Sequence, residues 1–363
     1  MNYNKIRRKT HAVKIGRVSI GGDNPIAIQS MTNTDTHDIP ATLAQIRALA
    51  AAGCDIVRVT VPDVASAAII PAVHEAGIEV PIVADIHFDY RVALACADFG
   101  VDKIRINPGN IGDEARVREV AQACRRKQIP IRIGVNSGSL EKHILAKYGE
   151  PSPEALCESA LFHAGLLEKY DFEDIVISIK SSDVYTMVKA TKLLAEKCNY
   201  PLHLGVTEAG SYKRGTLKSS AGLGALLCDG IGDTIRVSLT EDPLLEVDSA
   251  KELLTALNIE GQRGINIISC PTCGRTKISL IPLVHAFEEA VRAEGLSDVP
   301  CKVALMGCAV NGPGEAREAD FGVAGGAGDT VLFRHGEIVG RLQQDEVVPT
   351  LISLVRAFRG QDA

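Results

Sequence analysis

The stretch Asp55-Ile56-Val57-Arg58-Val59-Thr60-Val61 decides the fold of this chain. Its branched aliphatic residues predict a short buried strand, and the polar loop and Ala-rich segment that follow it predict a helix. The same unit of strand, loop and helix recurs from Ile26 to about Asp242. Short Val/Ile strands that alternate with helices are typical of a parallel sheet whose faces are covered by the helices.

Eight strands are expected in this region: Ile26–Gln29, Asp55–Val61, Pro81–Ile86, Lys103–Ile106, Ile131–Val135, Asp174–Ile179, Leu202–Val206 and Thr234–Leu239. Helices are expected between them, among others at Pro40–Ala52, Asp63–Ala76, Asp113–Arg126, Pro153–Lys169 and Asp183–Lys197. Eight repeats favour an α/β fold that closes into a (β/α)8 TIM barrel. An open, doubly wound sheet is the alternative.

The pattern changes after Asn258. Strands are expected at Ile265–Ser269, Val303–Met306, Phe321–Ala324, Thr330–His335 and Glu337–Leu342, and helices at Leu280–Ala293 and Val347–Phe358. This order predicts a smaller α+β domain. The 363 residues suit a barrel of about 250 residues followed by a companion domain. We therefore expect domains at 1–260 and 261–363, with Gly261 to Gly264 as the linker.

The overall charge argues against two classes of partner. The net charge is −6 and the pI is near 5.9, so nothing in the total favours nucleic acid or a membrane surface. No stretch approaches the roughly 20 apolar residues of a membrane span. The basic N-terminal segment lacks the apolar core of a signal peptide. We therefore expect a cytoplasmic protein.

Five of the expected barrel strands carry a cation. Four strands place an arginine between branched aliphatic residues, and a fifth ends in a lysine: Arg58, Arg105, Arg132, Arg236 and Lys180. Charges in such strands are costly unless they are paired or lie at the barrel mouth. Internal ion pairs would be a purely structural explanation. Cations from five strands instead predict a site for a compact polyanion at the carboxyl ends of the strands, and a diphosphate suits the planar fork of arginine.

Polar residues follow the same strands. Asp85 and His87 follow the third, Asn136 the fifth, Thr207 and Glu208 the seventh, and Ser238 lies near the end of the eighth. Any one of them would be an ordinary helix cap. Together they predict one site at the rim of the barrel, with Asp85 and Glu208 as the acid–base candidates.

Three cysteines of the second domain form a different kind of site. Cys270 and Cys273 make a CxxC pair, and Cys308 follows in a glycine-rich loop. Thiolates select zinc, copper(I) or iron–sulfur clusters. Zinc is the competing reading, but it needs a fourth ligand at close spacing. Cys301 lies before the strand that Cys308 follows, about 15–20 Å away, so it is not expected to be that ligand.

Glu315 is the candidate for the fourth ligand, because it follows Cys308 closely in Asn311-Gly312-Pro313-Gly314-Glu315. A solvated acid at the start of a helix is the alternative reading of this residue. Of the other cysteines, six lie mostly in Ala/Leu-rich segments and are expected to be small buried hydrophobes: Cys54, Cys96, Cys124, Cys157, Cys198 and Cys228.

These motifs resemble those of a known family. The segments Ser269–Arg275, Gly307–Cys308, Asn311–Glu315 and Pro25–Thr36 are similar to signatures of the 4-hydroxy-3-methylbut-2-enyl diphosphate synthases. The resemblance covers the whole chain, and its length matches the compact bacterial type.

The resemblance implies a TIM barrel followed by a domain related to sulfite and nitrite reductase modules. It implies a [4Fe–4S] cluster held by Cys270, Cys273, Cys308 and Glu315. The implied reaction is the reductive ring opening and dehydration of 2-C-methyl-D-erythritol 2,4-cyclodiphosphate in isoprenoid biosynthesis, with flavodoxin or ferredoxin as electron donor. The family is a homodimer in which the cluster domain of one subunit covers the barrel of the other.

The substrate-binding residues implied are Arg58, Arg105, Arg132, Asn136, Lys180, Thr207, Arg236 and Ser238, with His87 nearby. The catalytic candidates are Glu208, Asp85 and the cluster ligand Glu315. The alternative function is that of a non-redox barrel transferase resembling dihydropteroate synthase, with a structural zinc site. A simple electron-transfer module would leave the barrel cations without a purpose.

Overall fold

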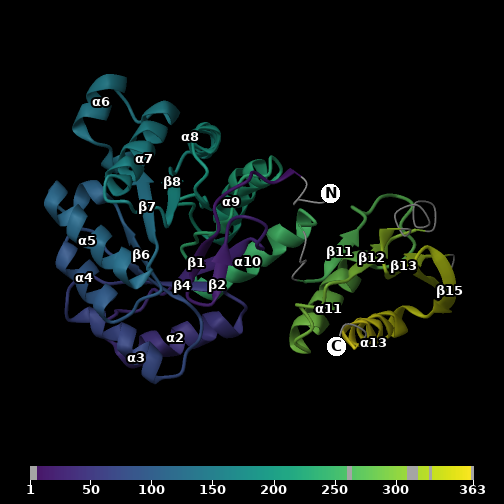
Figure 1. Cartoon of the computed structure of the whole chain (residues 1–363). Helices are drawn as coiled ribbons and strands as arrows, with labels where there is room; N and C mark the ends of the chain where they lie inside the picture. The colour runs from purple at the N-terminus through teal and green to yellow at the C-terminus, as the bar shows by residue number, and fades with distance from the viewer. Residues whose placement is uncertain (1–5, 260–263, 309–317, 327–328, 361–363) are drawn as a thin grey trace. The chain divides into compact units, whose positions relative to one another are not determined.

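The computed structural model describes residues 6–259, 264–308, 318–326 and 329–360. The chain divides into two compact units, Met1–Leu253 and Leu254–Ala363, which follow one another along the colour gradient of Figure 1. The boundary expected between residues 260 and 261 falls outside the described residues and stays a prediction.

The first unit is a barrel of eight parallel strands: β3 (Ala27–Met31), β4 (Ile56–Thr60), β5 (Ile82–Asp85), β6 (Lys103–Ile106), β7 (Ile131–Asn136), β8 (Ile175–Lys180), β9 (His203–Leu204) and β10 (Thr234–Ile235). Each strand pairs with the next in the chain from β3 to β8. Strand β10 pairs with both β9 and β3. A parallel bridge between Ile177 of β8 and Leu202, directly before β9, joins the two remaining edges of the sheet. The closed barrel is confirmed, and the open-sheet alternative is wrong.

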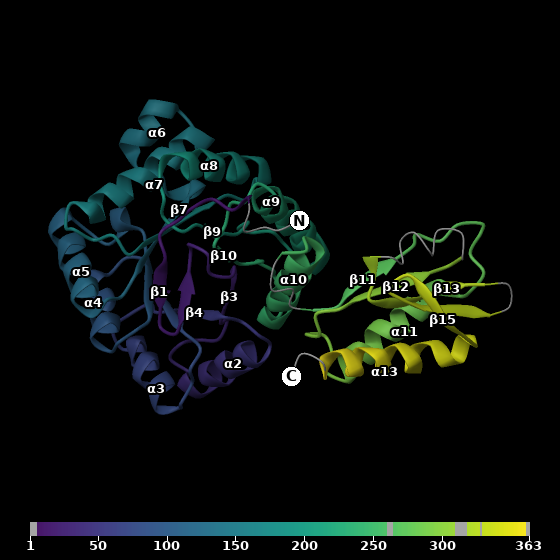
Figure 2. The same ribbon diagram turned by 45° about the vertical axis from the view of Figure 1, so that its right-hand side comes forward.

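Helices surround these strands, as Figure 2 shows. They are α2 (Ile39–Ala51), α3 (Ile69–Glu75), α4 (Tyr90–Asp98), α5 (Glu114–Lys127), α6 (Lys142–Tyr148), α7 (Pro153–Glu168), α8 (Val184–Lys197), α9 (Tyr212–Leu227) and α10 (Pro243–Ala256). Side chains cap several of them at the N-terminus, as Asp113 does for α5 and Ser152 for α7.

Several expected elements are shorter than the sequence predicted, such as β9, which is His203–Leu204 where Leu202–Val206 was expected. The helix expected from Asp63 begins only at Ser66, as a 3-10 turn, although Asp63 and Ser66 exchange the hydrogen bonds of a capping box. Strand β10 ends at Ile235, well before Leu239. The backbone N–H of Leu239 donates to a carboxylate of α10 instead of a neighbouring strand.

A short antiparallel hairpin that the sequence did not predict closes one end of the barrel. Strands β1 (Val13–Ile15) and β2 (Val18–Ile20) pair with each other and pack on Ala27, Ile56 and Val83. These residues lie at or near the amino ends of the barrel strands, so the hairpin plugs that end. A ligand therefore has to approach from the carboxyl ends.

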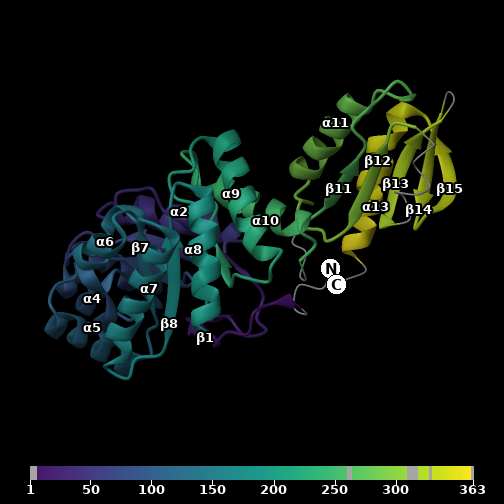
Figure 3. The ribbon, with the colours of Figure 1, turned by 90° about the horizontal axis from the view of Figure 1, so that it is seen from above.

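The second unit is a mixed sheet in the order β11 (Asn266–Ser269), β12 (Lys302–Met306), β13 (Phe321–Gly325), β14 (Thr330–Arg334), β15 (Glu337–Leu342), which Figure 3 shows side by side. The first three strands are parallel and the last three antiparallel. Helices α11 (Leu280–Ala293) and α13 (Val347–Arg359) cover one face (Figure 2) and pack on Val303, Leu305 and Phe321. The expected α+β domain is confirmed.

Replacing Arg7 by Met tests the ion pair beside the strand β10 that closes the barrel. Arg7 Nη2 lies 2.8 Å from Asp233 Oδ1, and both side chains are buried. Loss of the guanidinium leaves a buried carboxylate without its counter-charge, so the free energy of unfolding should fall by about 3–5 kcal/mol. Urea denaturation measures this. Lys9→Ala, which breaks the exposed pair with Asp23, is the control and should cost less than about 1 kcal/mol; an equal loss in both variants would contradict the prediction.

Candidate functional site

The inner face of the barrel is lined with charge. Successive residues of a strand point to opposite faces, so positions two apart share a face. Asp85 accepts a hydrogen bond from Arg105, the residue aligned with it in β6, and Arg105 in turn aligns with Arg132 of β7. By the same alternation Lys103 points inward with Arg105. The inward cations are Arg58, Lys103, Arg105, Arg132, Lys180 and Arg236, which interact electrostatically with one another.

Asp85 lies between two of these cations. Its Oδ1 accepts a hydrogen bond from Arg105 Nη1 at 3.0 Å, and its Oδ2 lies 3.6 Å from Arg58 Nε. Burial raises the pKa of Asp85, but the guanidinium groups of Arg58 and Arg105 outweigh it and hold the pKa well below its usual range. Asp85 is therefore an ionised counter-charge that holds two arginines in place.

Met31 separates two guanidinium groups. Its Sδ lies 2.9 Å from Arg58 Nη2 and 3.5 Å from Arg236 Nη1. A thioether is only a weak acceptor, so these N–H groups remain available to a stronger one. Burial lowers the pKa of Arg58 to about 10, with Asp85 opposing the shift, so Arg58 keeps its charge at neutral pH.

The deepest cations have donors without acceptors. Arg132 is fully buried and donates one hydrogen bond, from Nη1 to Ser178 Oγ at 2.8 Å, while its Nε and Nη2 have no partner among the described residues. Lys103 Nζ is equally buried and also lacks a partner within that part of the chain. Among the described residues, only two carboxylates form ion pairs with these cations. Asp85 pairs with Arg58 and Arg105, and Glu246 pairs with Arg236. Uncompensated buried cations are costly, so an anion in this interior would lower the electrostatic cost.

A glycine makes room for one of these side chains. A Cβ on Gly134 would lie 2.6 Å from Arg105 Nε and 2.7 Å from Arg105 Nη2. Arg105 Nη1 also lies 3.0 Å from His87 Nε2, at the mouth of the barrel. The structure thus brings His87, Asp85 and Arg105 together, as the sequence predicted.

The other predicted residues lie where the strands end. Asn136 is the last residue of β7, Thr207 and Glu208 follow β9, and Ser238 follows β10. Glu208 is exposed and has a φ of 53°, a left-handed conformation that is costly for a residue with a Cβ. Parallel strands of a barrel share one carboxyl end, so all four residues lie on the rim that the hairpin leaves open.

Sequence reasoning missed Lys103, Met31 and Glu246. Lys103 had a signal, because it stands two residues before Arg105 in the same strand. Glu246 had none, since an acid in the first turn of a helix is an ordinary dipole partner.

A hydrogen-bonded cluster joins two rim loops. Glu141, which precedes α6, accepts hydrogen bonds from Ser159 Oγ at 2.7 Å and pairs with His163 Nε2, both residues of α7. A Cβ on Gly109, in the loop after β6, would lie 2.8 Å from His163 Cε1. Burial raises the pKa of Glu141, but the bonds from His163 and Ser159 prevail and lower it to about 2. The loops after β6 and β7 therefore rest on one buried cluster.

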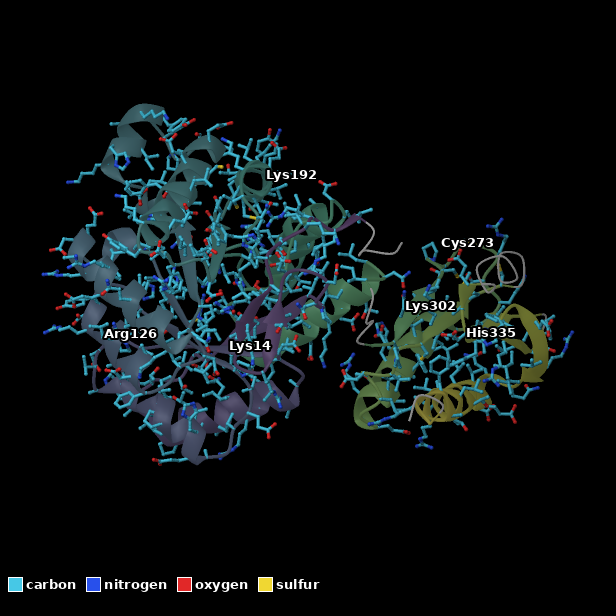
Figure 4. The ribbon with its side chains drawn as sticks, in the orientation of Figure 1. Lys14, Arg126, Lys192, Cys273, Lys302 and His335 are labelled. Atoms are coloured by element: carbon cyan, nitrogen blue, oxygen red, sulfur yellow. The ribbon has the colours of Figure 1, made fainter. Side chains whose placement is uncertain are left out.

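The second unit places two cysteines at neighbouring strand ends. Cys270 follows β11 and Cys308 lies just after β12, its parallel neighbour. Gly307 N donates to Cys270 Sγ at 3.2 Å, and Cys273, labelled in Figure 4, is exposed. The backbone N–H of Arg275 lowers the pKa of Cys273. The thiols of Cys270, Cys273 and Cys308 are ligands that suit a soft metal centre. Across the ranges that the structure describes, no three His, Cys, Asp or Glu side chains lie close enough together to hold a metal ion, and Glu315 lies outside those ranges.

The remaining cysteines are mostly structural. Cys301 belongs to the core beneath α11 and α13, and burial raises its pKa to about 12. It precedes β12 while Cys308 follows it, as predicted. Four of the six expected buried hydrophobes are buried; Cys198 is half-buried and Cys228 is exposed, so the prediction is wrong for Cys228. It lies at the exposed C-terminal end of α9.

The fold and the sites define a TIM-barrel protein whose interior is lined with cationic side chains, followed by a mixed-sheet domain that presents thiols. Residues 10–251 match the family model described as the GcpE TIM-barrel domain, and residues 266–357 match the GcpE protein C-terminal domain. The chain belongs to the GcpE family.

Curated relatives are similar over nearly the whole chain. The protein named 4-hydroxy-3-methylbut-2-en-1-yl diphosphate synthase (flavodoxin) from Clostridium perfringens is 54% identical over 97% of this chain and 99% of its own length. The protein of the same name from Maridesulfovibrio salexigens is 54% identical over 98% of this chain and 99% of its own.

Solved structures show a more distant likeness. Dihydropteroate synthase from Thermus thermophilus covers 68% of this chain and 98% of its own, with 14% identity and a TM-score of 0.49. This likeness carries no argument about function. Within the described residues, no helix combines the length and apolar character needed to cross a membrane.

The low pKa of Glu141 predicts how stability depends on pH. The folded pKa of about 2 lies below the usual value of 4.5, so the bonds to Glu141 stabilise the fold fully above pH 4.5. That contribution should be lost as the pH falls from about 4.5 towards 2. The free energy of unfolding, measured in urea across this range, should therefore fall less steeply in Glu141→Gln than in the parent. Equal slopes would contradict the prediction, and Glu119→Gln is the control for a change of charge alone.

Proposed function

We propose that this chain makes 4-hydroxy-3-methylbut-2-en-1-yl diphosphate from 2-C-methyl-D-erythritol 2,4-cyclodiphosphate, by reductive ring opening and loss of water. The observation that supports this most strongly is the set of buried, incompletely paired cations inside the barrel. They call for a compact polyanion, and the GcpE relatives carry the name of an enzyme whose product is a diphosphate. The reaction belongs to the methylerythritol phosphate route of isoprenoid biosynthesis and is an oxidoreductase reaction.

The barrel cations are proposed to bind the diphosphate group. Arg58, Arg105, Arg132, Lys180 and Arg236 would take its oxygens, and Asn136, Thr207, Ser238 and His87 would orient the rest of the ring by hydrogen bonds. Because the cations are buried and already fixed, they stabilise charge that develops on the leaving phosphate oxygen more strongly than water would.

Asp85 and Glu208 are proposed to have different tasks. Asp85 stays ionised between Arg58 and Arg105, so its task is to hold these arginines for the substrate. Glu208 is exposed at the end of β9, where it can exchange protons with solvent. We therefore assign the proton for the departing oxygen to Glu208.

Cys270, Cys273 and Cys308 are proposed to hold a [4Fe–4S] cluster, with Glu315 as the fourth ligand. When bound, such a cluster supplies the two electrons of the reaction one at a time. The names of the relatives favour flavodoxin over ferredoxin as the donor. We further propose a homodimer in which the cluster domain of one subunit covers the barrel of the other. A cytoplasmic location and domain limits at 1–260 and 261–363 remain predictions.

The ligand assignment predicts different iron contents for variants of Cys308 and Cys301, which lie on either side of β12. Cys308→Ser should lose most of the iron and sulfide, and with them the visible absorption of such clusters at about 400 nm. Cys301→Ala should keep them, because Cys301 lies in the core. Anaerobic purification followed by iron and sulfide analysis measures both. Zinc in place of iron would support the transferase alternative, and cluster loss in Cys301→Ala alone would overturn the ligand assignment.

The anion site predicts a change in substrate binding. Arg132→Gln removes a buried guanidinium whose Nε and Nη2 are unpartnered, so the Kd for the cyclic diphosphate should rise about tenfold or more. Calorimetry with the cyclic diphosphate measures the affinity. Arg125→Gln, which alters an exposed arginine paired with Asp171, is the control and should bind normally. Unchanged affinity in Arg132→Gln would count against the proposed site.

A further inference from the structure

Glu246 is a buried acid that enters the barrel site from outside the strands. It lies in the first turn of α10 and is 3% exposed. Acids in this position usually face solvent and interact with the helix dipole. The side chain of Glu246 instead reaches the end of β10 and the middle of β3.

The carboxylate accepts four hydrogen bonds. Arg236 donates from Nε to Oε2 at 2.9 Å and from Nη2 to Oε1 at 3.0 Å, which is a bidentate pair. Ser30 Oγ donates to Oε2 at 2.8 Å, and the backbone N–H of Leu239 donates to Oε1 at 3.0 Å. Each oxygen therefore has two donors, and the carboxylate has little capacity left for a ligand of its own.

These bonds determine where Arg236 points. Arginine has many rotamers, and a bidentate carboxylate restricts them to one arrangement. Arg236 lies among other cations that repel it, so without an acceptor it would turn towards water. Its Nη1, which faces Met31 Sδ at 3.5 Å, has only a weak acceptor and remains available to an anion.

The same carboxylate holds a loop. Leu239 follows Ser238, one of the predicted substrate contacts, and its N–H is fixed on Glu246. Ser30 belongs to the segment Pro25–Thr36 that the sequence marked as a signature. Glu246 thus ties three parts of the barrel rim together: β3, β10 and the loop after β10.

We propose that Glu246 is a positioning residue that presents Arg236 to the anionic substrate without touching the substrate itself. The inference rests on the proposed function, because it assigns Arg236 to substrate binding. It goes beyond that function by naming the residue through which Arg236 acts.

A double-mutant cycle tests the inference in the cluster-loaded enzyme. Glu246→Gln should raise the KM for the cyclic diphosphate about tenfold and change kcat much less. Arg236→Gln should raise KM at least as much. If Glu246 acts through Arg236, the double variant should resemble Arg236→Gln, whereas two independent roles would multiply their effects. Multiplied effects would overturn the inference.

A second variant separates position from charge. Glu246→Asp keeps the charge but shortens the side chain, so it should also raise KM if position matters. Loss of one negative charge alone would strengthen anion binding, so a lower KM in Glu246→Gln with a normal KM in Glu246→Asp would overturn the inference. Glu158→Gln, which alters the bonds that Glu158 of α7 accepts from Lys147 and Tyr148 of α6, is the control and should have the parental KM.

The outcomes separate this inference from the proposed function. If Arg236→Gln leaves KM unchanged, the anion site itself is misassigned. If Arg236→Gln raises KM and neither Glu246 variant does, only the positioning role fails. Melting temperature and iron content check the folding of each variant, and if Glu246→Gln fails to fold, Glu246→Asp carries the test.

Discussion

The ion pair of Asp85 with Arg58 and Arg105 is the constraint on which the barrel site depends. Packing several cations into one interior is unfavourable, because the low dielectric strengthens their repulsion. A single carboxylate between two guanidinium groups offsets part of that cost and fixes both side chains. It leaves the deeper cation Arg132 with unused donors. An anionic substrate bound there, as proposed, would offset the remaining imbalance.

The architecture directs that imbalance to one end of the barrel. The hairpin β1–β2 packs an apolar layer against the amino ends of the strands. The carboxyl ends carry the polar rim, as in other TIM barrels. A second carboxylate, Glu246, arrives from α10 and governs Arg236. Two acids from different elements thus arrange the site: Asp85 fixes Arg58 and Arg105, and Glu246 fixes Arg236.

Much of this could be predicted because strands have a simple period. Eight aliphatic stretches predict the barrel, and the alternation of faces along the four that carry an arginine predicts the face that carries charge. Strand β6 begins and ends where the sequence placed it. Local effects defeated other predictions: the residues from Ser66 form a 3-10 turn before the helix begins, and the bond from Leu239 to Glu246 ends a strand early. Such contacts leave no periodic trace.

The sequence by itself determined the repeating unit, the strand cations and the thiols of the second domain, since each is a local pattern of residue types. Only the tertiary structure decided which charges meet. Asp85 neighbours Arg105 in space because parallel strands align residues that are 20 positions apart in the chain. Glu246 reaches Ser30 across 216 positions, which only barrel closure brings together. Periodicity reports the face of a residue, whereas its partner depends on how distant segments close on one another.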